Sequence, residues 1–214
     1  MTEELLQQLQ QGCQDLGLVL TLEQQQKLLL YVELLAKWNK VYNLTSVRDE
    51  GEMISRHILD SLAILPFLSG TSMLDVGSGA GLPGIPVAIA RPDLAVTLLD
   101  SNSKKTRFLQ QVKAELALSN LSVVHSRIEH AELPRFSMVT ARAFSTIDNI
   151  IDLTGRHCDD AGCLLLMKGA YPEEELKFIS TSFMLKEVVS LTVPGCDGQR
   201  HLVHLVKEGM LEAE

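Results

Sequence analysis

The sequence has little of what several protein classes require. Its four cysteines, Cys13, Cys158, Cys163 and Cys196, are scattered, with no CxxC pair and no histidine at metal-ligand spacing. We interpret them as free thiols of a reducing compartment and expect neither a disulfide framework nor a metal site. The N-terminus lacks a basic segment followed by an apolar one, so we expect no secretory signal and a cytoplasmic protein.

Long hydrophobic runs and positive charge are also scarce. Even the run Ser61–Leu68 (SLAILPFL) is far too short to cross a bilayer, which takes about 20 apolar residues. Lysine and arginine number 19 against 27 aspartates and glutamates, for a formal net charge of −8. Phosphate neutralisation supplies most of the affinity of nucleic-acid binders. This balance therefore disfavours a nucleic-acid partner unless the cations gather on one face or a larger particle shares the docking.

The first 65 residues are predicted to be helical. Thr21, with Gln24 three residues later, forms a capping-box pattern. The apolar residues that follow recur at helical spacing: Leu28, Tyr31, Val32, Leu35, Trp38 and Tyr42. A second helix is predicted over Glu50–Leu65.

This second helix contains a histidine between two residues of opposite charge. Arg56 and Asp60 are spaced i,i+4 and so are expected to pair with each other. We therefore interpret His57 as a structural histidine and not as a catalytic base.

From Ser72 onward, short β-rich runs alternate with helical stretches. This alternation predicts an α/β fold with a mostly parallel, doubly wound sheet. The last two strand-like runs, LKEVVSLTVP and RHLVHLVK, predict a C-terminal antiparallel hairpin at one sheet edge. We thus predict an N-terminal helical segment, 1–68, packed on the core, and a sheet domain, 69–214. The predicted strands are Met73–Val76, Val96–Leu99, Ser122–Val124, Met138–Ala141 and Cys163–Met167, and the predicted helices are Ile85–Arg91, Lys104–Leu118, Ile147–Arg156 and Glu173–Ser180.

The stretch MLDVGSGAGLPGIP, residues 73–86, joins a predicted strand, a glycine-rich turn and a helix start. Two glycine registers compete in it. Gly77-x-Gly79-x-Gly81 follows the strand immediately, as in methyltransferases that use S-adenosyl-L-methionine. Gly79-x-Gly81-x-x-Gly84 satisfies the dinucleotide fingerprint. A purely structural turn is a third interpretation.

The prolines of this stretch favour the first register. A bound pyrophosphate needs amide donors at the helix N-terminus, but Pro83 and Pro86 have no N–H. S-adenosyl-L-methionine carries no phosphate and needs only a close approach to the backbone. The turn therefore indicates the sulfonium cofactor over a dinucleotide.

Two acids accompany the turn. Asp100 ends the second predicted strand, where a carboxylate can bind two ribose hydroxyls; both cofactors carry such a ribose, so this acid indicates a nucleoside only. The alternative is that Asp100 caps the next helix. Asp75, inside the first strand, could orient the turn through its amides or meet the cofactor's ammonium group, and the sequence leaves the two equal.

Two residues after the third strand fall where an adenine ring would lie. Ile128 could supply an apolar face, and Glu129 or its backbone could bind the exocyclic amine. For Glu129, a solvated helix start is the interpretation that the sequence alone favours.

Three cations lie close to the edge at which open α/β sheets bind their ligands. Arg142 follows the fourth strand in ARAF, Lys168 follows the fifth in MKGAY, and Arg200 opens the last strand in GQRHLV. Cations at neighbouring strand ends could hold the phosphates of a nucleic acid. Lys105 and its basic neighbours add positive potential but are interpreted as a solvated helix face.

No catalytic base stands out. ARAF occupies the place where many amino-group methyltransferases carry an Asn/Asp-Pro-Pro-aromatic motif. A ring nitrogen with a free lone pair needs no deprotonation before it attacks a methyl sulfonium, so positioning and desolvation suffice. The missing motif thus points to a target such as a ring nitrogen on the Hoogsteen edge of guanine.

Several stretches occur in the order found in one known family: WNKVYNLTSVRD, RHILDS, LDVGSGAGLPGIPVAI, LLDS with a later lysine and RFL, SRIE, ARAF and DGQRHLV. From about residue 20 to 206 the chain resembles the RsmG (GidB) family, bacterial methyltransferases that act on a guanine N7 of 16S ribosomal RNA. The resemblance implies a class I (Rossmann-like) methyltransferase fold and S-adenosyl-L-methionine as methyl donor. It also implies a cytoplasmic site of action and the assembled small ribosomal subunit as substrate.

The resemblance also implies site residues. By position it places cofactor contacts at Gly77, Leu82, Ile128 and Glu129, with Arg142 at the mouth of the site. With the turn and ribose arguments added, the predicted cofactor-binding residues are Gly77, Gly79, Gly81, Leu82, Asp100, Ile128, Glu129 and Arg142. The residues predicted to position the RNA for reaction are Arg142, Lys168 and Arg200. We expect the protein to act as a monomer.

One position departs from the family pattern, and two other functions stay open. Ser137 stands before the fourth strand where relatives carry Asp, which could cap a turn or support the site. One rival is an NAD-dependent oxidoreductase, which the prolines disfavour. The other is a non-catalytic RNA-binding or assembly factor with a vestigial pocket.

Overall fold

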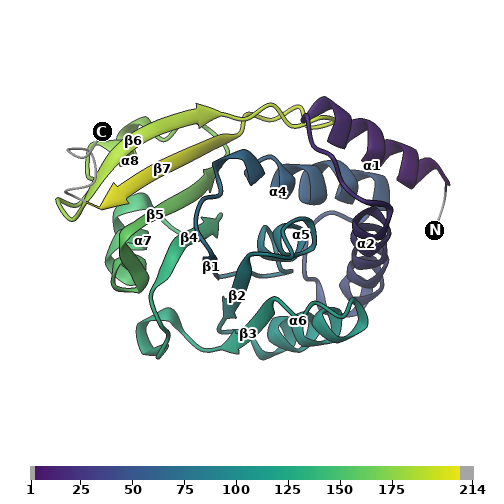
Figure 1. Cartoon of the computed structure of the whole chain (residues 1–214), viewed down its shortest axis with the longest axis horizontal. Helices are drawn as coiled ribbons and strands as arrows, with labels where there is room; N and C mark the ends of the chain where they lie inside the picture. Colours follow the sequence, from purple (N-terminus) through teal and green to yellow (C-terminus); the bar gives the residue numbers. More distant parts are fainter. Residues whose placement is uncertain (1–2, 208–214) are drawn as a thin grey trace.

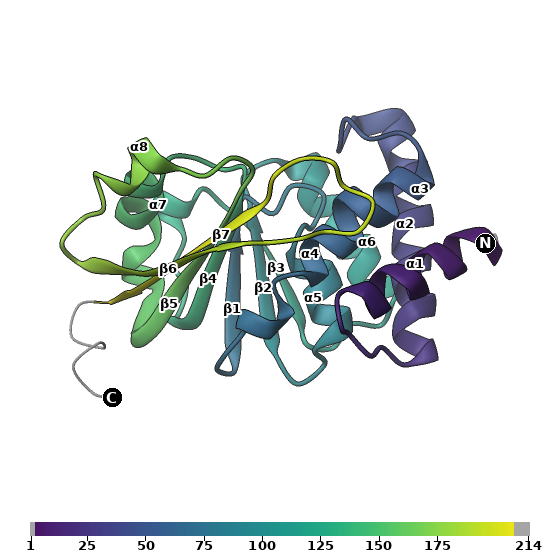
Figure 2. The same cartoon turned by 90° about the horizontal axis from the view of Figure 1, so that it is seen from above.

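The computed structural model describes residues 3–207 (Figures 1 and 2). Helix α1 (Glu3–Asp15) leads into the long helix α2 (Leu22–Tyr42). The predicted capping box is confirmed: the Thr21 hydroxyl accepts from the Gln24 N–H at 3.2 Å, and the Gln24 side chain accepts from the Thr21 N–H at 2.8 Å. Within residues 3–207 no helix is long and apolar enough to cross a membrane.

The single helix predicted over Glu50–Leu65 is interrupted. Its central turn is a π-helix, a rare feature that is frequent at functional sites. His57 lies in this turn and Asp60 directly follows it, both buried. The pieces are α3 (Glu50–Met53), the π-helix η1 (Ile54–Leu59), α4 (Asp60–Leu62) and the 3₁₀ turn η2 (Leu65–Phe67).

Seven strands form one sheet in the order β3-β2-β1-β4-β5-β7-β6. The first five strands are parallel, and β7 runs antiparallel to both β5 and β6. The predicted α/β class with a C-terminal antiparallel hairpin is thus confirmed, with β6 as the outer strand. The bounds are β1 Ser72–Val76, β2 Ala95–Asp100, β3 Leu121–His125, β4 Phe136–Arg142, β5 Cys158–Lys168, β6 Phe183–Ser190 and β7 His201–Lys207.

Most predicted bounds shift by a few residues, and two elements differ more clearly in length. Strand β5 begins five residues before the predicted Cys163, because residues 159–162, two aspartates followed by alanine and glycine, do not show the apolar alternation of a strand. The helix predicted over Glu173–Ser180 stops early. The helices between the strands are α5 Gly84–Ala90, α6 Ser103–Glu115, α7 Ile147–Thr154 and α8 Glu173–Leu176, with 3₁₀ turns η3 Ile128–His130 and η4 Gly155–His157.

Helices cover both faces of the sheet (Figure 1). Successive strand residues point to opposite faces, so Met73 packs in the hydrophobic cluster with α2, α5 and α6, and Leu74 packs in the one with α7. The Trp38 ring of α2 lies 5.5 Å from the Phe108 ring of α6, between centroids. The N-terminal helices therefore share a hydrophobic core with the sheet; the division at residue 68 stays a prediction.

Candidate active site

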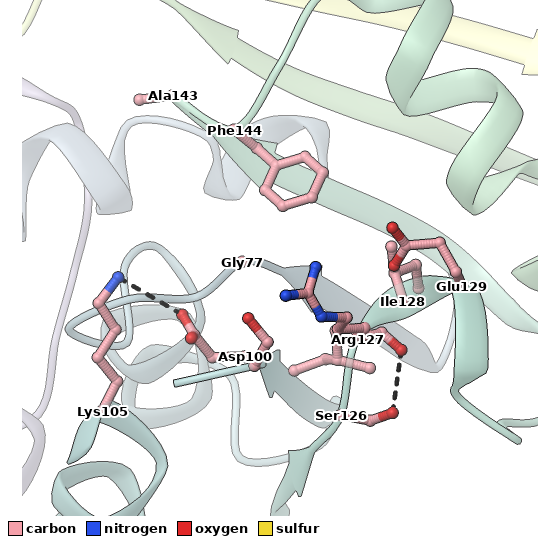
Figure 3. A pocket seen from close by; sticks show the side chains of 11 residues that line it. Gly77, Asp100, Lys105, Ser126, Arg127, Ile128, Glu129, Ala143 and Phe144 are labelled. Carbon is pink, nitrogen blue, oxygen red and sulfur yellow. Dashed lines mark hydrogen bonds and ion pairs between the residues drawn. The ribbon is translucent and has the colours of Figure 1, made fainter. Parts of the chain in front are cut away.

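The glycine-rich turn follows β1 at the carboxyl edge of the sheet. Gly77 has a φ of 68°, and a methyl group on it would collide with the Phe144 ring (Figure 3). Gly81, with a φ of 93°, faces the other way, and a methyl group there would collide with Ile85 in the core. Only glycine fits either position, but Gly77 borders a cavity whereas Gly81 is required by packing beneath the turn.

Seven backbone amides of residues 77–85 are already bonded inside the protein. These hydrogen bonds run, at 2.7–3.1 Å, from Gly77 and Ser78 to Leu99, from Gly79 to Asp100, from Gly81 and Leu82 to Ser78, from Gly84 to Asp75, and from Ile85 to Gly81. Pro83 and Pro86 have no N–H. At residues 81–86, where α5 begins, a pyrophosphate would therefore find no donor, which argues against a dinucleotide.

Asp100 connects this turn to the next helix. Its Oδ2 accepts from the Gly79 N–H at 2.9 Å, and its Oδ1 accepts from the Asn102 N–H at 2.8 Å. Helix α6 itself is capped by the Asn102 side chain. The Lys105 Nζ lies 3.8 Å from Asp100 Oδ2 (Figure 3), so this lysine faces the cavity beside the turn. A carboxylate has about four lone pairs, so Asp100 keeps acceptor capacity for ribose hydroxyls.

Asp75 supports the turn from below. Its side chain is fully buried, and Oδ2 accepts from the Gly84 N–H at 3.0 Å, while Oδ1 has no hydrogen-bond partner. Burial raises the pKa of this carboxyl to about 7. Of the two interpretations of Asp75, the geometry supports orientation of the turn.

A cavity of about 320 Å³, the first cavity, opens beside Gly77 (Figure 3). Ile128 and Glu129 both line it, and their carbonyls accept from the Arg156 guanidinium at 2.7 and 2.9 Å. Arg156 thereby fixes the segment that would face an adenine, a role that its sequence position does not reveal. The lining residues are Gly77, Leu99, Asp100, Ser101, Lys105, Ser126, Arg127, Ile128, Glu129, Ala143 and Phe144.

Four predicted cofactor residues do not line the first cavity: Arg142, described below, and three residues of the turn. Gly79 binds Asp100 from the turn, Gly81 packs on the core, and Leu82 is 5% exposed within the hydrophobic cluster. Their direct contacts with a cofactor stay predictions.

A second cavity of about 280 Å³ opens at the carboxyl ends of β4 and β5. It brings together Arg142, Lys168 and Arg200, the three cations predicted to act together. Arg142 lies on this wall and not on that of the first cavity, so its contact with a cofactor also stays a prediction. The lining residues are Asp60, Arg142, Ala143, Met167, Lys168, Gly169, Leu191, Arg200 and His201.

Two of these cations share one buried carboxylate. Asp60 Oδ2 accepts from Arg142 Nη1 at 2.8 Å, and Asp60 Oδ1 accepts from Arg200 Nε at 2.9 Å. The predicted Arg56–Asp60 pair is wrong, since Arg56 lies 3.4 Å from Glu52 instead. The π-helical turn explains the error, because its i→i+5 bonding removes the stacking of residues four apart.

The third cation has its own partner. Lys168 Nζ lies 2.7 Å from Glu175 Oε2 of α8 and donates to the Ser145 carbonyl at 2.8 Å. The three cations of the second cavity thus face two carboxylates, those of Asp60 and Glu175. This leaves one positive charge in excess.

His57 is held as a structural residue, as predicted. Its Nε2 lies 2.8 Å from the Thr45 hydroxyl and its Nδ1 lies 2.9 Å from the Arg56 carbonyl. Burial, and then the positive charge of Arg142, lower the pKa of His57 to about 4. The imidazole is therefore neutral at physiological pH and fully engaged in hydrogen bonds.

The sequence interpretation missed the contribution of Tyr31. This residue of α2 is fully buried, and its hydroxyl donates to the Ala80 carbonyl of the glycine-rich turn at 2.7 Å. Helical spacing marked Tyr31 only as an apolar core position. The available signal was its hydroxyl, because a tyrosine on the buried face of a helix needs a hydrogen-bond partner.

Ser137 lies far from both cavities along its strand. It is the second residue of β4, at the amino end of the strand, whereas the cavities lie at the carboxyl ends. Its N–H donates to Ser72 Oγ at 3.0 Å, and its hydroxyl accepts from the Thr71 N–H at 3.4 Å. Ser137 thus caps the turn before β1 and does not line either cavity.

Comparison with known proteins shows the family of the chain. The family model described as rRNA small subunit methyltransferase G matches residues 24–203. Ribosomal RNA small subunit methyltransferase G of Ectopseudomonas mendocina (strain ymp) is 52% identical over 210 residues, covering 96% of this chain and 97% of the relative. The protein of the same name from Pseudomonas syringae pv. syringae (strain B728a) is 50% identical over 208 residues, covering 96% of each chain.

Solved structures show the same fold at low identity. The glycopeptide N-methyltransferase MtfA superposes with a TM-score of 0.58 and 14% identity over 70% of this chain and 94% of that chain. TrmN from Thermus thermophilus gives a TM-score of 0.54 and 15% identity over 72% of this chain and 53% of that one. The sheet is thus that of Rossmann-like methyltransferases, and the chain belongs to the rRNA small subunit methyltransferase G family.

Proposed function

We propose that this protein transfers a methyl group from S-adenosyl-L-methionine to the N7 of one guanine in the 16S RNA of the small ribosomal subunit. The observation that carries the proposal is the meeting of two unlike cavities at Ala143, which lines both. The first cavity is lined by the glycine-rich turn and by Asp100, an acid placed to bind a ribose. The second cavity is lined by three cations. Family membership supports the RNA substrate.

The residues around the first cavity fit the methyl donor. When bound, S-adenosyl-L-methionine supplies an electrophilic methyl group on a sulfonium. Gly77 would permit close approach to the backbone, Asp100 would accept hydrogen bonds from the ribose hydroxyls, and Ile128 would supply an apolar wall for the adenine. Tyr31 and Asp75 hold the turn in shape from beneath.

The residues around the second cavity fit a ribonucleotide. Arg142, Arg200 and Lys168 bind phosphates on either side of the target and thereby fix the guanine opposite the first cavity. They do not face the reacting ring, because the methylated ring becomes positively charged and nearby cations would oppose it. Asp60 sets the orientation of both arginines through one carboxylate.

The reaction needs no general base. The N7 of guanine carries a free lone pair, so the protein contributes by positioning and by excluding water. His57 is buried, neutral and bonded on both nitrogens, so it is not available as a base.

Docking involves more than the site itself. A chain with a net charge of −8 gains little from general attraction to RNA, so the assembled subunit supplies part of the contact. We propose that the protein acts on this particle as a monomer in the cytoplasm.

The test uses S-adenosyl-L-methionine labelled in the methyl group. It is incubated with the protein and small subunits that lack base methylation, or with naked 16S RNA, and the RNA is digested to nucleosides. Labelled 7-methylguanosine from subunits, with weaker labelling of naked RNA, supports the proposal. Cofactor binding without label in either RNA contradicts it, and binding of NAD in place of the methyl donor favours the oxidoreductase rival.

A further inference from the structure

One aromatic side chain directly follows Ala143, the residue that lines both cavities. Phe144 lines the first cavity, is 38% exposed, and has its ring against Gly77 (Figure 3). Of the exposed large apolar side chains within residues 3–207, only this one lines either cavity. A single exposed apolar residue is ordinary by itself. The position of this ring on the cavity wall is what makes it available to a ligand there.

The backbone that carries this ring is strained. Ala143, directly before Phe144, has a φ of 51°, in the left-handed region that residues other than glycine rarely adopt. Ala143 also lines both cavities. Strain of this kind persists where the surrounding structure enforces it and is concentrated at functional sites. Here it turns the chain between the cavities and directs the Phe144 ring towards Gly77.

The reaction product carries a positive charge that a neighbouring aromatic ring can stabilise. Methyl transfer forms a bond from the N7 lone pair to the methyl carbon and breaks the carbon–sulfur bond, whose electron pair stays on sulfur. The positive charge moves from the sulfonium to the guanine ring, and no proton is exchanged. The second cavity already carries one positive charge in excess, through Arg142, Arg200 and Lys168 against Asp60 and Glu175.

An aromatic face can support such a charge without an anion. Its quadrupole attracts cations, and nucleobases stack on aromatic side chains in a sequence-tolerant way. We propose that Phe144 is a catalytic residue that stacks on the target guanine and stabilises the positive charge developing on its ring. This inference rests on the proposed function and adds the group that contacts the reacting base.

The competing role for Phe144 is an apolar wall of the cofactor cavity. The two roles differ in what a substitution changes. A wall residue affects the binding of S-adenosyl-L-methionine, and any apolar side chain of similar bulk replaces it. A stacking residue affects turnover of the RNA, and only another aromatic ring replaces it.

The test compares Phe144→Leu, Phe144→Tyr and Phe144→Trp with the wild type, using small subunits as substrate. Phe144→Leu should lower kcat/KM by roughly ten- to a hundredfold, while the Kd for S-adenosyl-L-methionine stays within about twofold. The two aromatic variants should keep most of the activity. Full activity of Phe144→Leu, or a loss explained by weaker cofactor binding, would overturn the inference.

Fluorinated phenylalanines at position 144 test the charge directly. Fluorine withdraws density from the ring face while keeping its shape, so log kcat should fall steadily with each added fluorine. A flat series would show that the face supports no charge. Failure of the proposed function is distinct, because it appears as absent 7-methylguanosine with the wild-type protein itself.

Discussion

Asp60 and Arg142 form an ion pair of 2.8 Å although 82 positions separate them in the sequence. The Asp60 side chain is only 3% exposed, and its other oxygen binds Arg200 at 2.9 Å. One carboxylate thus sets the direction of two guanidinium groups at the wall of the second cavity.

Asp60→Asn should separate RNA binding from turnover. The substitution keeps the shape but removes the charge, so both arginines lose their common anchor. Turnover on small subunits should fall by about tenfold or more, whereas non-specific RNA binding becomes tighter and more steeply salt-dependent, because positive charge is released. Filter binding over a salt series and initial rates measure the two effects.

A matched control exists for this variant. Glu52→Gln also removes a carboxylate that pairs with an arginine, but at an exposed position. It should change stability by less than about 1 kcal/mol and leave turnover unaltered. Equal losses in both variants would mean that Asp60 has no special part in orienting the arginines.

Arg142→Ala should weaken the binding of RNA and leave the binding of the cofactor unchanged. Loss of one phosphate contact should reduce the slope of log K against log salt by about 1. The Kd for S-adenosyl-L-methionine should stay near the wild-type value in calorimetry. Arg135→Ala is the control, because Arg135 lies before the amino end of β4 and pairs with exposed Asp160. A loss confined to cofactor binding would refute the assignment of Arg142.

Asp100→Asn should weaken the binding of the cofactor and leave the binding of RNA unchanged. The amide keeps one oxygen acceptor for the turn but loses charge-assisted bonds to the ribose, each of about 1.5–3 kcal/mol. The Kd for S-adenosyl-L-methionine should rise by on the order of ten- to a hundredfold. Asp93→Asn, an exposed acid paired with Arg91, should leave it unchanged. Unaltered cofactor affinity in Asp100→Asn would remove Asp100 from the site.

Tyr31→Phe should show that helix α2 supports the glycine-rich turn. Removal of the hydroxyl leaves the buried Ala80 carbonyl without this donor. The free energy of unfolding should fall by about 1–3 kcal/mol, and cofactor affinity should fall with it. Tyr171→Phe, at a residue 53% exposed, is the control for the chemical change. Denaturant titrations measure the first effect, and stability equal to wild type would argue against the support.

Asp75→Asn should alter how stability depends on pH. The folded-state pKa is raised from 3.8 to about 7, so the unfolded chain ionises first as pH rises. The stability contributed by the protonated carboxyl is therefore complete below pH 3.8 and is lost between pH 3.8 and about 7. The stability difference, variant minus wild type, should be smallest near pH 4 and grow to a plateau above pH 7.

The rise in this difference corresponds to at most about 4 kcal/mol. Thermal unfolding of both proteins in the same buffers, from pH 4 to 8, measures it. A difference independent of pH would show that the carboxyl of Asp75 ionises as easily in the folded protein as in the unfolded chain.

The sequence predicts those parts of the site that depend on local pattern. The turn around Gly77 and the strand-end acid Asp100 follow one another within two βα units, so spacing alone places them together. The helix cap at Thr21 is equally local and is confirmed. The five parallel strands follow from alternation of apolar runs with helices.

Long-range contacts escape such reasoning. Asp60 meets Arg200 across 140 positions, and no periodicity encodes that approach. Helical spacing predicts an ion pair between Asp60 and Arg56, which is wrong. The apolar pattern does not reveal the π-helical turn that separates the two side chains. In the sequence pattern Tyr31 is one more apolar core position, and only the structure shows its hydrogen bond to the Ala80 carbonyl. The separation of the two cavities likewise depends on how β4 and β5 lie side by side.

The protein is proposed to methylate one guanine of 16S RNA at N7, and the position of that guanine in the RNA can be mapped directly. Small subunits lacking base methylation are treated with the protein and S-adenosyl-L-methionine, and their 16S RNA is cleaved chemically at 7-methylguanine. The account predicts one cleavage site and about one methyl group per subunit. Methyl groups on another base, or spread over many guanines, would contradict it.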